Sequence, residues 1–208
     1  MENHDKQLEE GIFIGNQVDK ANLSNPISKK LVSGFDEKLF GALDGLSPQS
    51  LHEVGCGEGR LTRLIRDRYE MEVLASDFSQ ALIEENLRRD FESIDFKHLS
   101  IYDLNPAEHR RDVILCCEVL EHLEYPEKGL EALRKLEARS YLLSVPREPV
   151  WRVLNMLRLK YLGDLGNTPG HLNHWSSKSF QALLAAAGFR VVKAMNPFPW
   201  VMVVAEPS

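Results

Sequence analysis

LHEVGCGEGR, residues 51–60, is the stretch of sequence that decides the fold. It begins with a short apolar segment typical of a strand, continues through a Gly-x-Gly-x-Gly turn, and ends where a helix is expected to begin at Arg60. Gly55 and Gly57 can adopt backbone angles that other residues avoid, and they let a ligand lie against the main chain. The first N–H groups of the following helix have no partners within the helix. The stretch therefore predicts a ligand-binding loop between a strand and a helix.

Short apolar segments alternate with amphipathic segments along most of the chain. Such alternation predicts an α/β fold, in which a parallel sheet carries helices on both faces. The nearly continuous apolar run at 112–117 (DVILCC) is expected of a strand that is buried on both faces. Strands are expected at 51–54, 71–75, 94–99, 112–117, 140–145, 189–195 and 200–205, and helices at 60–69, 79–89 and 126–136 and after Ser176.

The N-terminal part of the chain has a different character. Residues 1–24 are mostly polar, and Asn25-Pro26 is a typical start of a helix. Gly34 and Gly41 weaken that helix, so one interrupted helix or two short ones are expected. We therefore divide the chain into an N-terminal helical cap, 1–47, and a domain, 48–208. The apolar stripe of the cap helix consists of Ile27, Leu31, Phe35, Leu39 and Leu43.

Composition excludes several classes of protein. Of the 208 residues, 43% are hydrophobic and 27% are charged, as in ordinary soluble globular proteins. The formal net charge of −6 argues against a broad electrostatic grip on DNA or RNA, which needs a basic surface. No apolar run approaches the roughly 20 residues that span a bilayer, and the N-terminal residues lack the pattern of a secretory signal. Three cysteines without a Cys-x-x-Cys pair are expected to be the reduced thiols of a cytoplasmic protein.

Two acidic residues follow the next two expected strands. Asp77 comes about 20 residues after the glycines, where a carboxylate suits the hydroxyls of a ribose. Asp103 follows the third strand, where it can accept a hydrogen bond from an exocyclic amine. Each acid taken singly is equally typical of a turn. Because ligands of parallel sheets bind beyond the carboxyl ends of the strands, the two acids and the glycine loop together indicate one ligand site.

With these residues the sequence resembles the class I S-adenosylmethionine-dependent methyltransferases. The resemblance covers residues 48–145 well, and the end of the chain by pattern only. The spacing Glu53-x-Gly55-x-Gly57-x-Gly59 is similar to that family's first motif, and it differs from the Gly-x-Gly-x-x-Gly of NAD enzymes. The resemblance implies a Rossmann-like sheet of seven mostly parallel strands with the last strand antiparallel. It also implies S-adenosyl-L-methionine as the cofactor and S-adenosyl-L-homocysteine as its product.

The resemblance further implies a set of cofactor-binding residues. Glu53 would support the loop or the methionyl amine, Asp77 would hold the ribose hydroxyls, and Phe78 would line the adenine. Asp103 would contact the adenine amino group, and Glu118 would lie near the methionine end. The full set is Glu53, Gly55, Cys56, Gly57, Gly59, Asp77, Phe78, Tyr102, Asp103, Leu104, Cys117 and Glu118.

A second group of polar residues follows the fourth expected strand, in EVLEH at 118–122. If this segment forms a helical turn, Glu118, Glu121 and His122 share one face. His171 and His174 come much later, in GHLNHWS. Carboxylates with histidines can bind a divalent ion, can act as a general base with an orienting acid, or can simply cap and pack the next turn. All three interpretations stay open.

Segments similar to EVxEH occur in two groups of the same family. One group is the ubiquinone-pathway O-methyltransferases. The other is the small-RNA 3′-terminal 2′-O-methyltransferases, whose metal site uses Glu-x-x-Glu-His with later histidines. The chain matches Glu118, Glu121 and His122, whereas the later histidine match is loose and no RNA-binding domain is visible. We therefore leave a divalent metal open and assign no metal ligand.

Residues 146–175 form an insertion longer than the 2–6 residues of an ordinary connection. An apolar face at helical spacing predicts either a lid helix over the acceptor site or a helix that only stabilises the domain. Residues 146–178 carry five basic and two acidic residues, a balance of +3, which suits an acidic acceptor but is also typical of a solvated helix face. The apolar face consists of Val150, Leu154, Leu157 and Tyr161, and the basic residues are Arg147, Arg152, Arg158, Lys160 and Lys178.

We therefore predict a methyltransferase that acts on a small-molecule or lipid-like acceptor, with oxygen as the favoured methyl acceptor. His122, His171 and His174 are the candidate bases, and Glu121 is the fourth catalytic candidate. The alternatives are a metal-assisted RNA 2′-O-methyltransferase and a non-catalytic S-adenosylmethionine-binding partner subunit. No DNA partner and no membrane insertion are expected, and RNA is disfavoured. The chain is expected to be a monomer or a homodimer, with Trp200 and the PFPW segment, 197–200, either in a dimer contact or covering the sheet edge.

Overall fold

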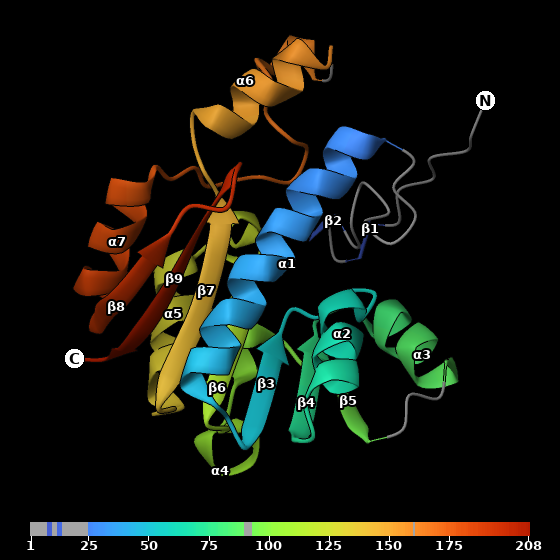
Figure 1. The fold of residues 1–208 in the computed structure, drawn as a ribbon, viewed down its shortest axis with the longest axis vertical. Coiled ribbons are helices and arrows are strands. Elements are labelled where there is room, and N and C mark those ends of the chain that lie inside the picture. The colour runs from blue at the N-terminus through green and yellow to red at the C-terminus, as the bar shows by residue number, and fades with distance from the viewer. Residues whose placement is uncertain (1–7, 10–11, 14–24, 90–92, 160) are drawn as a thin grey trace.

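A seven-stranded sheet forms the centre of the fold (Figure 1). The computed structural model describes residues 8–9, 12–13, 25–89, 93–159 and 161–208. The strands of the sheet are β3 (Ser50–Val54), β4 (Glu72–Asp77), β5 (Ile94–His98), β6 (Val113–Cys117), β7 (Ser140–Pro146), β8 (Phe189–Met195) and β9 (Trp200–Pro207). Their order is β5-β4-β3-β6-β7-β9-β8, and β9 alone runs in the opposite direction to the other six strands. The predicted Rossmann-like sheet with an antiparallel last strand is confirmed.

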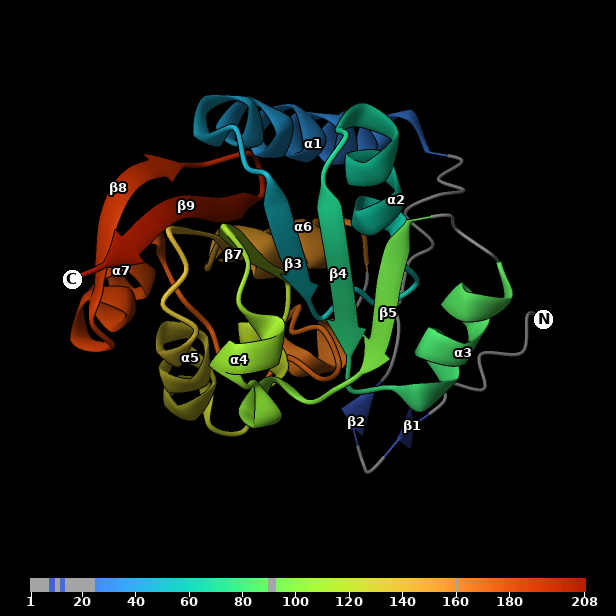
Figure 2. The same cartoon turned by 90° about the horizontal axis from the view of Figure 1, so that it is seen from below.

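Helices cover both faces of the sheet (Figures 1 and 2). α1 (Pro26–Leu46) and α2 (Arg60–Arg68) lie on one face, and α5 (Pro126–Lys135) and α7 (Ser177–Ala186) lie on the other. In Figure 1 the arrowhead of β7 points toward α6 (Val150–Leu157). The remaining elements are α3 (Gln80–Arg88), α4 (Pro106–His109), the 3₁₀ turns η1 (Ile101–Asp103), η2 (Leu120–His122) and η3 (Leu162–Asp164), and a separate strand pair, β1 (Leu8–Glu9) and β2 (Ile12–Phe13).

The residues of β6 alternate between two apolar layers. Ile114 and Cys116 belong to the layer that α5 and α7 cover. Val113, Leu115 and Cys117 belong to the layer that α1 and α2 cover. Burying one large aliphatic side chain contributes roughly 1.5–3 kcal/mol. A strand with helices on both faces is therefore most stable when it is apolar throughout, as its sequence predicts.

Helix α1 is continuous from Pro26 to Leu46, which corrects the expectation of an interrupted helix or two short ones. Gly34 and Gly41 lie inside it, and each costs about 1 kcal/mol relative to alanine. Phe35, Leu39 and Leu43 are buried against the sheet. Because each of these side chains contributes roughly 1.5–3 kcal/mol on burial, packing outweighs the cost of the two glycines.

Polar contacts also hold α1 in place. The side-chain oxygen of Asn25 accepts a hydrogen bond from the N–H of Ile27 at 2.8 Å, so Asn25 is the N-cap that the sequence predicts. Asp36 pairs with Arg60 at the start of α2. Most of residues 1–24 lie outside the described residues, so the division of the chain at residue 48 stays a prediction.

Helix α6 is shorter than the sequence predicts. It ends at Leu157, whose side chain is 75% exposed, and Tyr161 lies beyond its end. The predicted apolar face through Leu157 and Tyr161 is therefore wrong. The chain folds back along the helix because the buried amide of Asn155 donates to the carbonyl of Gly166 at 2.9 Å. Lys160, one of the five basic residues of the insertion, lies outside the described residues.

Trp200 is part of the core and is only 5% exposed. Its ring meets Phe35 edge-on at 5.1 Å between centroids and Trp151 at 5.6 Å. The interpretation of Trp200 as a dimer contact is therefore wrong, because its ring is occupied within the chain. Among the described residues, no helix is both long and apolar enough to cross a bilayer.

A buried tyrosine provides a test of this packing. Tyr141 is 0% exposed, and its hydroxyl accepts from the N–H of Ala138 at 3.0 Å and donates to the carbonyl of Leu133 at 3.1 Å. We predict that Tyr141→Phe lowers the free energy of unfolding in urea by about 1–3 kcal/mol, because the buried N–H of Ala138 loses its partner. The control Tyr125→Phe changes a side chain that is 48% exposed and should cost less than about 0.5 kcal/mol. Equal losses in the two variants would contradict the prediction.

Candidate active site

The glycine loop joins β3 to α2 at the carboxyl end of the parallel strands. Gly55 and Gly57 have φ angles of +78° and +53°, which favour glycine. A Cβ at Gly55 would lie 2.2 Å from Cγ2 of Val119, so the loop packs directly against the chain that follows β6. A Cβ at Gly57 would meet no atom of the described residues within 4 Å. The backbone at Gly57 thus faces open space in which a ligand can lie.

Hydrogen bonds from the neighbouring strand and helix hold this loop. The N–H of Gly57 donates to Oδ2 of Asp77 at 2.8 Å, and Oδ1 of the same carboxylate accepts from the N–H of Ser79 at 2.9 Å. Nδ2 of Asn86 donates to the carbonyl of Gly57 at 2.8 Å. The carboxylate of Asp77 therefore joins the ends of β3 and β4 beside the open backbone. This arrangement fits a nucleoside whose ribose lies between the loop and Asp77.

Glu53 lies in β3 just before the loop and is 3% exposed. The hydroxyl of Thr62 in α2 donates to its Oε2. Burial raises the pKa of Glu53 to about 8, because a charged carboxylate is disfavoured away from water. A cationic group beside Glu53 would favour its ionised form. The buried carboxyl therefore suits a cofactor that carries an ammonium and a sulfonium.

The residues predicted for the adenine follow β4 and β5. Phe78 is half-buried, Tyr102 is 42% exposed, Asp103 is exposed and Leu104 is buried. They lie at the same edge of the sheet as Asp77, because the carboxyl ends of adjacent parallel strands share one edge. Their contacts with adenine stay predictions.

Two cysteines of the predicted cofactor set are packed as neutral side chains. Cys56 lies in the glycine loop and Cys117 ends β6, and both are buried. Burial raises the pKa of both thiols. Because the thiolate is the reactive form of cysteine, neither residue is suited to act as a nucleophile.

Glu118 departs from the arrangement that the sequence predicts. Its φ is +60°, and the helical turn η2 begins only at Leu120. Oε2 of Glu118 accepts from the indole N–H of Trp200 at 2.6 Å, and Oε1 accepts from the hydroxyl of Ser144 at 3.4 Å. The expectation that Glu118 shares a helical face with the other polar residues of EVLEH is therefore wrong. Its role toward the cofactor stays a prediction.

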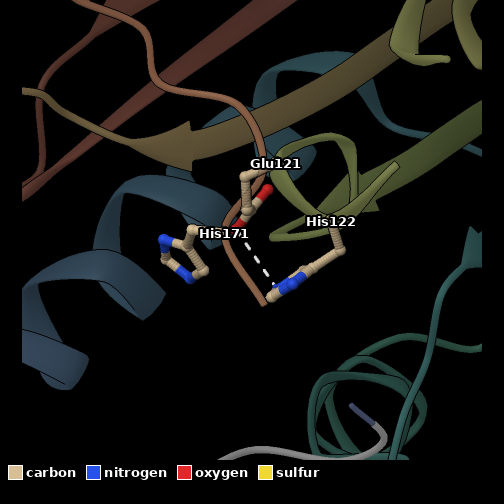
Figure 3. A group of neighbouring side chains, drawn as sticks. All are labelled: Glu121, His122 and His171. Carbon is tan, nitrogen blue, oxygen red and sulfur yellow. Dashed lines mark ion pairs between the residues drawn. The ribbon is translucent and has the colours of Figure 1, made fainter. Parts of the chain in front are cut away.

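Glu121, His122 and His171 converge after the carboxyl end of β6 (Figure 3). One ligand-type atom of each residue lies within 4.8 Å of the other two. Nε2 of His122 lies 3.9 Å from Oε1 of Glu121, and the two imidazole rings meet edge to face at 4.9 Å between centroids. Glu121 is 1% exposed and His171 is 8% exposed. The structure thus brings together three of the four predicted catalytic residues.

Residues 170–173, called the strap below, are hydrogen-bonded to η2. The carbonyl of Glu121 accepts from the N–H groups of Leu172 and Asn173 at 2.8 and 3.0 Å. Nδ1 of His122 lies 2.9 Å from the carbonyl of Gly170. Because a carbonyl only accepts hydrogen bonds, Nδ1 carries the proton, and Nε2 of the neutral ring carries the lone pair. His122 therefore presents a basic nitrogen to the cluster.

His174, the fourth catalytic candidate, lies outside this group. Its Nε2 is 2.6 Å from Oδ1 of Asn167. Burial lowers the pKa of His174, so the neutral ring is favoured. The structure does not bring His174 together with the other three candidates.

Several supporting residues are not identified by the sequence analysis. The indole N–H of Trp151 and Nδ2 of Asn155 both donate to the hydroxyl of Thr168, at 2.9 and 3.1 Å. Nδ2 of Asn173 donates to the carbonyl of Leu123 at 2.6 Å. These contacts fix the segment that carries His171. The available signals were a lone asparagine in the apolar α6 and an asparagine between two histidines, and neither specifies a partner.

Comparison with known proteins shows the family. A family model described as a methyltransferase domain matches residues 33–194. The chain belongs to this family. The resemblance to the class I S-adenosylmethionine-dependent methyltransferases is confirmed by this match, and the fold agrees with it.

Three solved methyltransferases show the same fold. Magnesium protoporphyrin IX methyltransferase from Synechocystis PCC 6803, solved with bound SAH, is 19% identical, with a TM-score of 0.66 over 90% of each chain. Human N-acetylserotonin methyltransferase, in complex with SAM, is 18% identical, with a TM-score of 0.63 over 86% of this chain and 51% of that chain. An S-adenosylmethionine-dependent methyltransferase from Mesorhizobium loti is 13% identical, with a TM-score of 0.60 over 79% of this chain and 95% of that one.

One curated relative also matches part of the chain. It is an uncharacterized protein of Synechococcus sp. strain PCC 6301, 33% identical over 99 residues. The matched stretch is 45% of this chain and 24% of the relative. The match therefore spans about a quarter of that protein's length.

The buried Glu53 predicts an unusual pH dependence of stability. The pKa of Glu53 is about 8 in the folded chain against an ordinary 4.5, so between these pH values the folded state holds a proton that the unfolded state releases. Stability from this group is therefore present below about pH 4.5 and lost as the pH rises to 8. We predict that the free energy of unfolding, measured in urea from pH 5 to pH 8, falls by more than about 1 kcal/mol relative to Glu53→Gln. Parallel pH profiles for the two proteins would refute this.

Proposed function

We propose that the protein transfers the methyl group of S-adenosylmethionine to a hydroxyl oxygen of a small-molecule or lipid-like acceptor. The observation that carries this proposal is the convergence of Glu121, His122 and His171 after β6, in a segment that packs on the glycine loop. Val119, which packs against Gly55, precedes Glu121 by two residues. A group that removes a proton therefore lies next to the loop expected to hold the methyl donor.

The chain's own residues divide the work. Glu53 would face the cationic groups of the cofactor, and Asp77 would face its ribose. The open backbone at Gly57 would lie against the cofactor between them. When bound, S-adenosylmethionine supplies a methyl group on a positively charged sulfur and leaves as S-adenosylhomocysteine. Methyl transfer to oxygen also requires that the acceptor hydroxyl lose its proton. When the cluster holds no metal ion, Nε2 of His122 accepts that proton, while Nδ1 stays hydrogen-bonded to the carbonyl of Gly170 and keeps the ring oriented.

Three observations support a small acceptor and a reducing compartment. The protoporphyrin and N-acetylserotonin methyltransferases, which share this fold, are named for small acceptors. The net charge of −6 disfavours a long nucleic acid as the acceptor. The three cysteines are buried and free of disulfides, as expected in the cytoplasm.

Cofactor binding can be tested at Asp77. In Asp77→Asn the amide can no longer accept from both Gly57 and Ser79, so the loop loses one hydrogen bond and the predicted ribose acceptor is weakened. We expect calorimetric titration to show S-adenosylhomocysteine binding at least about tenfold weaker, which is about 1.4 kcal/mol. The control Asp95→Asn removes an exposed carboxylate of β5 and should bind as the unmodified protein does. Unchanged binding by Asp77→Asn would argue against the ribose role.

Proton removal can be tested at His122. Release of S-adenosylhomocysteine is measured with a panel of catechols, phenols and hydroxy acids. With any acceptor that is turned over, His122→Ala should lower kcat by about 10²–10⁴-fold while the Kd of S-adenosylhomocysteine stays within about twofold. His174→Ala, in contrast, should retain most of the activity.

If His174→Ala lowers kcat and His122→Ala does not, His174 would be assigned as the base. Tight cofactor binding with methylation only of amines or carbon would reject the O-methyl assignment. Tight binding without turnover of any acceptor class would favour the non-catalytic partner subunit.

A further inference from the structure

The cluster after β6 contains the atoms that a metal ion needs, drawn from two distant parts of the chain. Glu121 and His122 come from η2, and His171 comes from the strap (Figure 3). We propose that these three residues bind one divalent transition-metal ion of the zinc type. The set contains two imidazole nitrogens and one carboxylate oxygen. This inference goes beyond methyl transfer, because ion binding by the cluster does not depend on the identity of the acceptor.

The spacing of the three ligand atoms is close to that of a metal site. Atoms no more than 4.8 Å apart fit within a circle of radius about 2.8 Å, so an ion at the centre would lie at most that far from each. Zinc bonds to nitrogen and oxygen measure roughly 2.0–2.2 Å. Each ligand would therefore move inward by less than about 1 Å, which side-chain torsions alone can supply.

The orientation of the rings is already that of a ligand set. Metal-binding histidines usually donate their other ring N–H to a backbone carbonyl or a carboxylate, which fixes the tautomer. His122 does this through Nδ1 and the carbonyl of Gly170. His171 forms an edge-to-face pair with His122 and stacks on Trp151, whose ring lies 6.1 Å away with an interplanar angle of 29°. The lone pair of His122 Nε2 is thereby directed into the cluster.

Charge and burial favour an ion at this place. Glu121 is 1% exposed, and a buried carboxylate is stabilised by an adjacent cation. Imidazole ligands suit zinc, iron, copper and nickel, whereas Mg²⁺ prefers a shell of oxygens with several waters. Three protein ligands would leave a fourth position of a tetrahedral ion for a water or a substrate oxygen. His122, with 31% of its side chain exposed, is the most accessible of the three ligands.

The ion would change how the acceptor loses its proton, a consequence that rests on the proposed function. With the ion bound, Nε2 of His122 is a ligand and no longer takes the proton. An acceptor hydroxyl in the fourth position would instead ionise on the metal, because coordination lowers its pKa. The proton would leave to solvent, and the resulting alkoxide or phenolate would be the nucleophile.

Direct binding of ions by the full chain tests the proposal. Protein treated with EDTA and dialysed is titrated with Zn²⁺ in competition with a chromogenic chelator, and separately with Co²⁺, whose visible absorption reports its coordination. We expect one Zn²⁺ per chain and a Co²⁺ spectrum typical of four or five ligands. Mg²⁺ should not compete at equal concentration. Glu121→Gln and His171→Ala should each weaken Zn²⁺ binding by about 100-fold or more, since loss of a mere supporting residue costs 10–100-fold.

Matched controls separate the cluster from other surface ligands. Glu131→Gln removes an exposed glutamate of α5, and His174→Ala removes a histidine outside the cluster. Both should bind Zn²⁺ as the unmodified chain does. Thermal unfolding and S-adenosylhomocysteine titration of every variant show whether it is folded.

Three results would overturn the proposal. The first is that the chain binds neither Zn²⁺ nor Co²⁺. The second is that Glu121→Gln and His171→Ala fold and bind Zn²⁺ with unchanged affinity. The third is that the chain prefers Mg²⁺ to Zn²⁺. If the unmodified chain binds Zn²⁺ but does not bind S-adenosylhomocysteine, the result counts against the proposed function and leaves the metal site standing.

Discussion

The absence of a side chain at Gly55 is the constraint on which the site depends. A single added carbon there would lie 2.2 Å from a methyl group of Val119. Without it, the turn after β3 packs directly on the turn after β6, at the point where the order of the parallel strands reverses. This contact places the loop expected to hold the cofactor beside the residues expected to act on the acceptor. Ligands of α/β sheets bind at this kind of switch point.

The position of the strap depends on the main chain of Glu121. Its carbonyl accepts two N–H groups of the strap, which follows about 50 residues later in the sequence. Thr168 in turn receives hydrogen bonds from Trp151 and Asn155 of α6. The position of His171 thus follows from contacts made by the insertion on one side and η2 on the other. The insertion is part of the site as well as a connection between β7 and α7.

Sequence periodicity predicts the sheet well because burial imposes it. The central strand β6 is apolar on both faces, and the glycine spacing marks the turn after β3. Prediction fails where a local rule competes with tertiary contacts. Gly34 and Gly41 suggest a broken helix, but burial of the opposite side of α1 keeps it whole. Leu157 continues a helical pattern, yet its side chain faces solvent.

The same competition explains the mixed outcome in EVLEH. A helical turn predicts one shared face, whereas the positive φ of Glu118 directs that carboxylate to Trp200 and Ser144. The residue types of Glu121, His122 and His171 are visible in the sequence. Their meeting is not, because it depends on strap hydrogen bonds that no local pattern encodes.

The N–H groups of Leu172 and Asn173 in the strap bind the backbone oxygen of Glu121, an atom that every type of residue carries. Architecture and reactivity are therefore separable at this position. Evolution, or a protein engineer, can exchange the carboxylate for another group while the strap keeps its place. A scaffold of this kind can change its chemistry one side chain at a time and still fold, which is a physical basis for the diversity of acceptors on a single fold.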